Sequence, residues 1–367
     1  MAPFDAAACA FMDRALALAA QGLLTAPPNP RVGCVVVNNG VVIGEGFHVQ
    51  PGHAHAEVNA LADVRARGHD SRGATLYVTL EPCNHHGRTP PCVDAILGAG
   101  IVRVVAAMAD PNPVASGGIE RLRAAGIVVE LGPGADAALD LNPGFVSRVT
   151  RGRPWVRMKI AASIDGRTAL QNAQSQWITG PDARADGHAW RARACAILTG
   201  IGTVLHDDPR MTVREVTTPR QPLRVIVDRH GETPASARIL EGDGALIVTA
   251  GERNRAWPVQ VESLALPDEH GRVDLAAMMQ ALGAREVNEL HVEAGAKLNG
   301  ALLEAGLVDE LLVYIAPRVI GDPARGAFER PAALTSLAAT EHFEWHDVQR
   351  VGADMRMRLR RVMGAAS

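Results

Sequence analysis

Residues 79–92 read TLEPCNHHGRTPPC, and the tripeptide His55-Ala56-Glu57 stands upstream of them. Both cysteines of this stretch, Cys83 and Cys92, directly follow a proline. One imidazole and two thiolates form a ligand set for Zn²⁺ that leaves the fourth position open. The two thiolates balance the charge of the ion, and water at the open position then loses a proton near neutral pH. The pattern therefore predicts a catalytic zinc site held by His55, Cys83 and Cys92.

Glu57 is the predicted proton carrier of this site. Its carboxylate is free to take a proton from water and to pass protons to a ring nitrogen and to leaving ammonia. Residues i and i+2 do not face each other in the middle of a helix, so His55 must stand at the very start of one. A helix that begins near Cys83 would stabilise its thiolate, and Thr89-Pro90-Pro91 is a helix-start signal directly before Cys92.

Two other interpretations of these residues remain open. A structural zinc site needs a fourth protein ligand, for which His53, His85 and His86 are the candidates. A Cys83–Cys92 disulfide is disfavoured, because an odd number of cysteines scattered over a long chain is not typical of a disulfide framework. Cys9, Cys34 and Cys195 are predicted to be core residues. His188 and His206 are predicted to be surface or packing residues.

Strand and helix patterns alternate through the first half of the chain, which predicts an α/β layer structure with a partly parallel sheet. Apolar residues at helical spacing predict an N-terminal amphipathic helix over 4–19. Asn38-Asn39-Gly40 separates two β-branched runs and is typical of a hairpin. The predicted strands are 32–37, 41–46, 74–80, 101–107 and 127–130, and the predicted helices are 56–67, 93–99 and 119–125.

The pattern breaks around residues 145–154, where the chain is basic and polar, and we place a domain boundary near Thr150. The predicted domains are therefore 1–149 and 150–367. In the second, residues 231–244 and 251–271 are expected to be loops. Its predicted strands are 156–162, 196–199, 223–227, 245–249, 289–293 and 311–315, and its predicted helices are 182–193, 274–282 and 296–305.

Length and composition limit the classes of function. A chain of 367 residues is too long for one ordinary core. A net charge of −3 with 4% aromatic residues does not favour nucleic acid or an anionic membrane as a partner. Asp5, Asp13 and Arg14 interrupt the apolar N-terminus, which is unlike a signal peptide. We expect a cytoplasmic enzyme that acts on small molecules.

The motifs of the first half resemble one family of zinc deaminases. Residues 55–57 and 79–92, together with 28–34 and 110–113, are similar to the deaminase half of the bifunctional riboflavin-biosynthesis deaminase/reductase. Eight residues separate the cysteines, where the general signature has two, and Pro28 replaces a histidine that is usual in the family. The resemblance implies a cytidine-deaminase-like α/β/α domain that hydrolytically deaminates a diaminopyrimidinone carrying a ribosylamino 5-phosphate. It also implies a substrate pocket lined by Asn29, His48, His85 and Arg88.

The second half resembles the reductase half of the same family in residues 159–167, 175–179, 202–209, 293–300 and 308–317. Residues 290–300 alone, LHVEAGAKLNG, would fit a packing turn as well as a nucleotide site, since they lack the G-x-G-x-x-G fingerprint. The resemblance implies a dihydrofolate-reductase-like α/β domain that uses NADPH to reduce the ribosyl group to a ribityl chain. The implied NADPH contacts are Ala161, Trp177, Thr203, Asp207, Gly295, Ala296, Lys297, Leu298, Asn299, Gly300 and Ala301.

The implied reductase substrate residues are Lys159, Ser175, Arg191, Met211, Arg214 and Glu293. Guanidinium groups suit a 5-phosphate, whereas Ser175 and Glu293 suit sugar hydroxyls. The proton donor of this step stays open between Asp207, Lys159 and bound water. Ala294 stands where the family often has glycine. The resemblance also implies a homo-oligomer, built on the second domain.

Two competing functions use the same motifs. A nucleic-acid base deaminase with a non-reductase accessory domain would use the same zinc chemistry, although the acidic balance and few aromatic residues argue against it. A non-catalytic zinc-stabilised domain beside a nucleotide-binding module would contain the same three ligands. Replacement of Glu57 separates this last hypothesis from an enzyme.

Overall fold

The computed structural model describes residues 4–87, 90–172, 174–252, 256–321, 323–330 and 332–362. The chain divides into two compact units, Met1–Gly152 and Arg153–Ser367. The predicted boundary near Thr150 falls inside helix α6 (Pro143–Arg151), which ends at Gly152 with a φ of 70°. The division after Gly152 lies within the expected break at 145–154, but most of that segment belongs to α6. Phe145 and Ser147 are buried in unit 1, so this basic segment is an amphipathic helix.

A five-stranded sheet forms the centre of the first unit. Its strands are β1 (Gly33–Asn38), β2 (Val41–Phe47), β3 (Thr75–Val78), β4 (Arg103–Ala106) and β5 (Val128–Leu131). The strand order is β2-β1-β3-β4-β5. β1 pairs antiparallel with β2 and β3, whereas β3, β4 and β5 run parallel. The predicted partly parallel sheet is confirmed.

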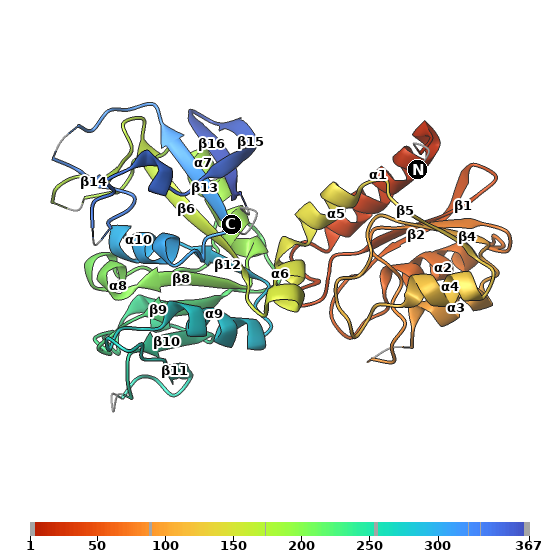
Figure 1. The fold of residues 1–367 in the computed structure, drawn as a ribbon, viewed down its shortest axis with the longest axis horizontal. Coiled ribbons are helices and arrows are strands. Elements are labelled where there is room, and N and C mark those ends of the chain that lie inside the picture. Colours follow the sequence, from red (N-terminus) through yellow and green to blue (C-terminus); the bar gives the residue numbers. More distant parts are fainter. Residues whose placement is uncertain are drawn as a thin grey trace. The chain divides into compact units, whose positions relative to one another are not determined.

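Helices cover both faces of this sheet, as Figure 1 shows. They are α1 (Ala6–Gln21), α2 (Ala56–Ala66), α3 (Cys92–Gly98), α4 (Gly118–Ala124) and α5 (Ala135–Leu141). Successive strand residues point to opposite faces. Val36 consequently packs in a core with Leu61 of α2 and Ile96 of α3, and Val35 packs in the opposite core with Met12 of α1. The result is an α/β/α unit.

Two local sequence signals behave as predicted. Asn39 and Gly40 have φ values of 48° and 76°, the left-handed pair that a type I′ hairpin turn requires. Asp5 caps α1 by accepting a hydrogen bond from the amide of Ala8 at 2.7 Å. The predicted hairpin and the predicted N-terminal helix are both confirmed.

A nine-stranded sheet forms the centre of the second unit. Its strands are β6 (Trp155–Ser163), β8 (Ala196–Gly200), β9 (Leu223–Val227), β10 (Ala245–Thr249), β11 (Val261–Ala265), β12 (Glu289–Val292), β13 (Glu310–Ala316), β15 (Phe343–Val351) and β16 (Asp354–Arg361). Their order is β11-β10-β9-β8-β12-β6-β13-β16-β15. The strands from β11 to β13 run parallel, and β16 and β15 add an antiparallel edge.

Helices also cover both faces of the second sheet. They are α7 (Pro181–Arg193), α8 (Ile201–Asp207), α9 (Leu275–Ala284) and α10 (Ala296–Glu304), with short 3₁₀ turns η1 (Arg238–Leu240) and η2 (Leu337–Ala339). Met278 of α9 and Leu302 of α10 pack in one core with Leu198 of β8. Val204 of α8 packs against the opposite face with Ile197. The short strands β7 (Arg167–Ala169) and β14 (Arg325–Gly326) form a separate antiparallel pair.

Buried charges connect three strands of this sheet. Arg157 of β6 is fully buried and donates to Glu289 of β12 and Glu310 of β13, both at 2.9 Å. The guanidinium of Arg157 lies 4.4 Å from the centre of the Trp190 ring, a cation–π contact. Breaking such a pair costs about 3–5 kcal/mol, because one charge stays buried without its partner. The network therefore makes the second unit depend on the ionised state of its carboxylates.

Several elements of the second unit differ from the sequence prediction, among them helix α8, which was not predicted. The expected loop 251–271 contains β11, which pairs with β10 at an edge of the sheet. Residues 343–361 form β15 and β16, which were not predicted. Many of their residues are exposed or half-buried, so the apolar alternation is weak. Among the described residues, no helix has both the length and the apolar character needed to cross a membrane.

Candidate active sites

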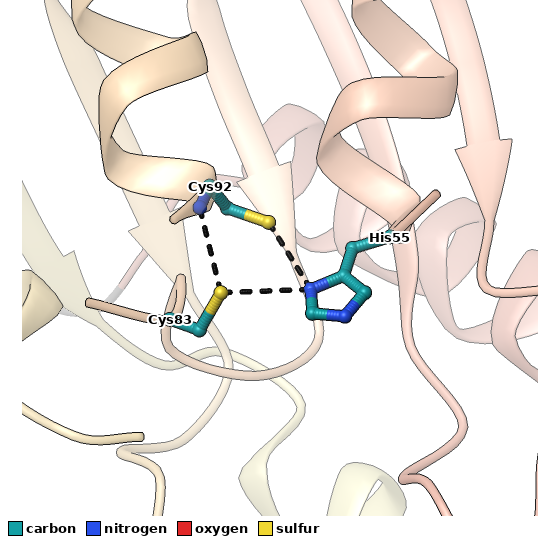
Figure 2. Close-up of side chains that lie close together, drawn as sticks. All are labelled: His55, Cys83 and Cys92. Atoms are coloured by element: carbon teal, nitrogen blue, oxygen red, sulfur yellow. Dashed lines mark hydrogen bonds between the residues drawn. The ribbon is translucent and has the colours of Figure 1, made fainter. Parts of the chain in front are cut away.

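The three predicted zinc ligands lie together in the first unit (Figure 2). The Nδ1 atom of His55 is 3.5 Å from the Sγ atom of Cys83 and 3.3 Å from that of Cys92. All three ligand atoms lie within 4.8 Å of one another. Both cysteines are free thiols that face the imidazole, so the pair is not a disulfide. This donor set fits Zn²⁺, because one nitrogen and two sulfurs converge on one point.

Helix starts place two of these ligands. His55 is the N-cap of α2 with extended backbone angles, and Glu57 follows in the first turn. This is the position that the His-x-Glu spacing requires, and that prediction is confirmed. Cys92 is the first residue of α3, and its amide donates to the Sγ atom of Cys83 at 3.4 Å. The start of α3 therefore stabilises the Cys83 thiolate, as an N-terminal helix dipole does.

The protonation pattern of the ligands also fits a cation. A hydrogen bond from the Cys92 thiol, followed by hydrogen bonds from His55 and the Cys92 amide, lowers the pKa of Cys83. The hydrogen bond with Cys83 raises the pKa of His55. The Cys83 thiolate and burial raise the pKa of Cys92. Two sulfurs that compete for one proton are a site where a divalent cation would replace that proton.

Glu57 is buried beside the ligands, with 3% of its surface exposed. Burial, and then the negative charge of Cys83, raise the pKa of its carboxyl to about 7. A carboxyl group with such a pKa can both accept and release a proton near neutral pH. Glu57 therefore has the position and the acidity of a proton carrier.

Asn29 and His48 lie next to the zinc ligands. The rings of His48 and His55 meet edge to face with their centres 5.3 Å apart. The side-chain amide of Asn29 lies 3.0 Å from Nε2 of His48, and Nδ1 of His48 lies 3.2 Å from the carbonyl of Ala54. This pattern requires a neutral ring that accepts at Nε2 and donates at Nδ1. Burial lowers the pKa of His48, which agrees with that state.

Of the other two predicted pocket residues, the structure describes His85 but not Arg88. His85 is half-buried, and its Nδ1 atom is buried without a hydrogen-bond partner. Arg88 and Thr89 lie outside the described residues. Among the residues that are described, neither His53, His85 nor His86 joins the three-ligand group. None of the candidate fourth ligands therefore lies within 4.8 Å of all three ligand atoms.

A second layer of contacts fixes the loop that carries Cys83. The Oε1 atom of Glu81 accepts from the amides of Gly117 and Ile119 at 3.0 Å, and its Oε2 atom accepts from Asp110 at 3.0 Å. Gly118 approaches the same loop so closely that a Cβ atom would lie 1.8 Å from the carbonyl oxygen of Pro82. Sequence reasoning missed Glu81 and Gly118 as supports, although Glu81 lies within the quoted stretch 79–92.

A cleft of about 2180 Å³ marks the second unit. Its volume can hold two ligands of nucleotide size, since pockets for one small molecule are about 300–1,000 Å³. Almost every residue that the resemblance implied for the reductase lines it, namely Lys159, Ala161, Ser175, Trp177, Arg191, Thr203, Asp207, Met211, Arg214, Glu293, Gly295, Ala296, Lys297, Leu298, Asn299 and Ala301. His206, expected to be a surface or packing residue, is exposed and also lines this cleft.

Gly300 is the exception among the residues that the resemblance implied for the reductase. It lies inside α10, where a Cβ atom would stand 1.9 Å from the carbonyl oxygen of Glu329. It is not among the residues that line the cleft. The glycine thus lets α10 pack against the segment near Glu329, and the expected NADPH contact at this position stays a prediction.

Glu293 is the centre of a charged group in the cleft. Arg191 donates to both carboxylate oxygens, with the Nη2 to Oε2 distance at 2.9 Å, and Lys159 Nζ lies 3.9 Å from Oε2. Burial acts to raise the pKa of Glu293, but the charges of Arg191 and Lys159 hold it well below its usual value. Burial lowers the pKa of Lys159. The cleft therefore presents a carboxylate and two cations at one place.

Two family profiles match the chain, one in each unit. The profile described as "Cytidine and deoxycytidylate deaminase zinc-binding region" covers residues 6–108. The profile described as "RibD C-terminal domain" covers residues 154–356. The riboflavin biosynthesis protein RibD of Escherichia coli is 46% identical over 95% of this chain and 98% of its own length. The chain belongs to the RibD family. A RibD from Haemophilus influenzae is 44% identical, covering 97% of this chain and 98% of itself.

Solved structures of RibD proteins share the whole fold. A RibD structure from Acinetobacter baumannii has 40% identity and a TM-score of 0.87 over 97% of this chain and 99% of its own. A deaminase/reductase from Thermotoga maritima has 35% identity and a TM-score of 0.89 over the same shares. RibD is the bifunctional enzyme of riboflavin biosynthesis, with a zinc-binding deaminase domain and an NADPH-dependent reductase domain. A nucleic-acid base deaminase with a non-reductase domain would not contain the RibD C-terminal domain that residues 154–356 match.

Proposed function

We propose that residues 1–149 deaminate diaminohydroxyphosphoribosylaminopyrimidine and that residues 150–367 reduce 5-amino-6-(5-phosphoribosylamino)uracil, the two activities named for the similar Thermotoga maritima protein. The observation that carries the proposal is the convergence of His55, Cys83 and Cys92 beside the buried carboxyl of Glu57. The two reactions are consecutive, since the first removes an amino group and the second reduces the ribosyl group of the resulting uracil.

His55, Cys83 and Cys92 would hold Zn²⁺ in the deaminase domain. When bound, the ion acts as a Lewis acid and lowers the pKa of water at its open position. Glu57 takes a proton from the attacking water and delivers protons to the ring nitrogen and to the departing ammonia. Asn29 and the neutral His48 present polar atoms to the edges of the substrate ring. His85 offers an unpaired buried nitrogen, and Arg88 suits the 5-phosphate.

The cleft of the second unit would hold NADPH and the ribosyl substrate together. We assign Ala161, Trp177, Thr203, Asp207 and the 295–301 turn to NADPH, with Gly300 serving the turn through packing. Ser175, Met211 and Glu293 face the substrate with Lys159. Arg191 uses three of its N–H groups on Glu293 and Thr212, and one N–H remains on each terminal nitrogen for a phosphate oxygen. NADPH supplies the hydride, and these residues hold the sugar carbon close to it.

A Glu57→Gln variant tests the deaminase assignment. The amide keeps the size of the side chain but cannot carry the proton, so ammonia release should fall by about 10²–10⁴-fold. Zinc content and NADPH oxidation with the deaminated substrate should stay at the level of the unchanged protein. Ammonia release that survives the substitution would contradict the assignment and favour a structural zinc site. Ammonia released from single-stranded RNA or DNA, with none from the ribosylaminopyrimidine, would favour the competing base deaminase.

The expected homo-oligomer and cytoplasmic location belong to the same proposal. β15 is an edge strand of the second sheet, and it exposes Trp345 and Val348 with 66% and 50% of their surface accessible. An exposed apolar edge strand is a site where a second sheet can pair. Five free thiols, two of them in the metal site, suit a reducing compartment. Sedimentation of the purified chain would test the oligomer, and a monomer at micromolar concentration would contradict it.

A further inference from the structure

Residues 208–214 of the second unit form an irregular loop on the cleft. They contain neither helix nor strand, and Asp208 and Met211 have positive φ values of 39° and 50°. Such values are costly for residues other than glycine, so the surrounding structure must hold this backbone in place. Met211 and Arg214 of the loop line the cleft.

Side chains bind the backbone of this loop at three consecutive residues. Arg191 of α7 donates to the carbonyl of Thr212 at 3.1 Å. The side-chain amide of Gln221 accepts from the amide of Val213 at 2.8 Å and donates to its carbonyl at 3.1 Å. Nδ1 of His188 accepts from the amide of Arg214 at 3.1 Å. Polar side chains therefore supply the backbone of residues 212–214 with the hydrogen bonds that a neighbouring strand would supply in a sheet.

His188 is behind the cleft wall and does not line it. It lies three residues before Arg191, so both side chains leave the same face of α7. Only 8% of its surface is exposed, and it is not among the residues that line the cleft. The sequence prediction of a surface or packing residue is thus right about packing but misses the polar contact.

The ring of His188 stays neutral, which the contact requires. Burial lowers its pKa to about 4, with further lowering by the charges of Arg191, Arg214 and Lys159, against which Glu293 acts. An imidazolium would have a proton on Nδ1 and could not accept from the amide of Arg214. The acceptor is therefore present throughout the neutral range.

We propose that His188 is a positioning residue of the reductase, which fixes the backbone of Arg214 so that its guanidinium meets the phosphate of the ribosyl substrate. This inference rests on the proposed role of Arg214. The side chain of Arg214 is exposed at the cleft, and its Nη1 atom returns to Thr212 at 3.0 Å and 3.2 Å. Its orientation is thus tied to the same loop that His188 holds.

The experiment compares four single variants and one double variant of the full-length protein by steady-state reduction. His188→Leu removes the acceptor and should raise KM for the phosphorylated substrate by about 10-fold, the value of one lost hydrogen bond. KM for NADPH, kcat and ammonia release should change less than 2-fold, a range of about 0.4 kcal/mol. His188→Asn places an amide oxygen near the position of Nδ1 and should restore most of the substrate KM. His342→Leu makes the same exchange at an exposed histidine and should change nothing.

Arg214→Ala separates this inference from the proposed function. If Arg214→Ala leaves the substrate KM unchanged, the phosphate role of Arg214 is wrong, and the proposal for His188 falls with it. If Arg214→Ala raises the KM but His188→Leu does not, only the inference about His188 is wrong. In the double variant, His188→Leu should add little to Arg214→Ala, because it acts through that residue. Additive effects, or equal losses for substrate and NADPH, would overturn the positioning role in favour of a general structural one.

Discussion

The cysteines of this chain differ in the burial and the contacts of their sulfur atoms. Cys83 and Cys92 face an imidazole, and the pKa of Cys83 is lowered. Cys34 is fully buried, and burial raises the pKa of its thiol well above the usual value. Cys9 on α1 and Cys195 are only half-buried, although both were predicted to be core residues. Only the first pair has the surroundings of a metal ligand.

Replacement of single cysteines should therefore give different zinc contents. Cys92→Ser exchanges a thiolate for a weakly acidic hydroxyl, so the purified protein should lose most of its zinc and its ammonia release. Cys9→Ser makes the same exchange outside the site and should keep about one zinc per chain. Metal analysis and a stepwise assay measure both, and NADPH oxidation should stay unchanged in each variant. Equal zinc content in the two variants would refute the ligand assignment.

The sequence was sufficient for residues whose role follows from local chemistry. The His-x-Glu spacing could only work at a helix start, and His55 is found there. His188 could not be found in this way, because its partner is the backbone of a residue 26 positions away. Every residue except proline has a main-chain N–H group, so the sequence does not show which residue donates this hydrogen bond. The helical spacing between His188 and Arg191 was the only available signal.

At the scale of elements, strong local signals gave strands and helices that the structure contains. Asn39-Gly40 defines the β1–β2 hairpin by backbone preference alone. β11 and β15 are edge strands that each pair with one strand only, β10 and β16, and the exposed faces of β11, β15 and β16 conceal the apolar pattern. Helix α6 was hidden because its basic residues suggested a linker. Edge elements owe their conformation to neighbours, which periodicity in one segment does not reveal.

The contact between α4 and the Cys83 loop leads to a prediction about an element. In Gly118→Ala, the new methyl group would collide with the carbonyl oxygen of Pro82, so α4 or the loop must move. Overpacking of this kind costs about 1–3 kcal/mol of unfolding free energy. Because Cys83 follows Pro82 directly, zinc affinity and ammonia release should fall with it. Chemical denaturation and metal titration measure the two effects.

Gly98→Ala is the matched control for this prediction. Gly98 lies in helix α3 of the same unit, and nothing lies within 4 Å of an added Cβ atom. Alanine is the better helix residue, so this variant should be about 0.4–1 kcal/mol more stable with unchanged ammonia release. A Gly118→Ala protein as stable and active as Gly98→Ala would show that the close approach does not constrain the loop.

At the scale of the whole molecule, the five tryptophans allow the second unit to be observed by itself. Trp155, Trp177, Trp190, Trp257 and Trp345 all lie in residues 153–367, and the first unit has none. Trp190 stands among the arginines of the buried network, 4.4 Å from Arg157 and 5.0 Å from Arg358. Its fluorescence therefore reports directly on the packing that the network maintains. Any unfolding followed through tryptophan is that of the reductase unit.

The buried network should make this unit sensitive to acid. Burial acts to raise the pKa of Glu310, but the charges of Arg157 and Arg358 hold it below its usual value. A carboxyl whose pKa is lower in the folded state binds more protons when unfolded. It adds stability above its unfolded pKa of about 4.3, and that stability is lost as the pH falls through the folded pKa. The urea midpoint from tryptophan fluorescence should therefore decrease steeply below about pH 4.5.

Glu310→Gln distinguishes this network from the general effect of acid. The variant leaves buried arginines with one carboxylate fewer, so at pH 7 it should lose about 3–5 kcal/mol of unfolding free energy. Its midpoint should then change less between pH 5 and pH 3 than that of the unchanged protein, because the group that titrates is gone. Glu344→Gln, at an exposed position of β15, should preserve the original pH dependence. Identical slopes for all three proteins would show that the acid sensitivity arises elsewhere.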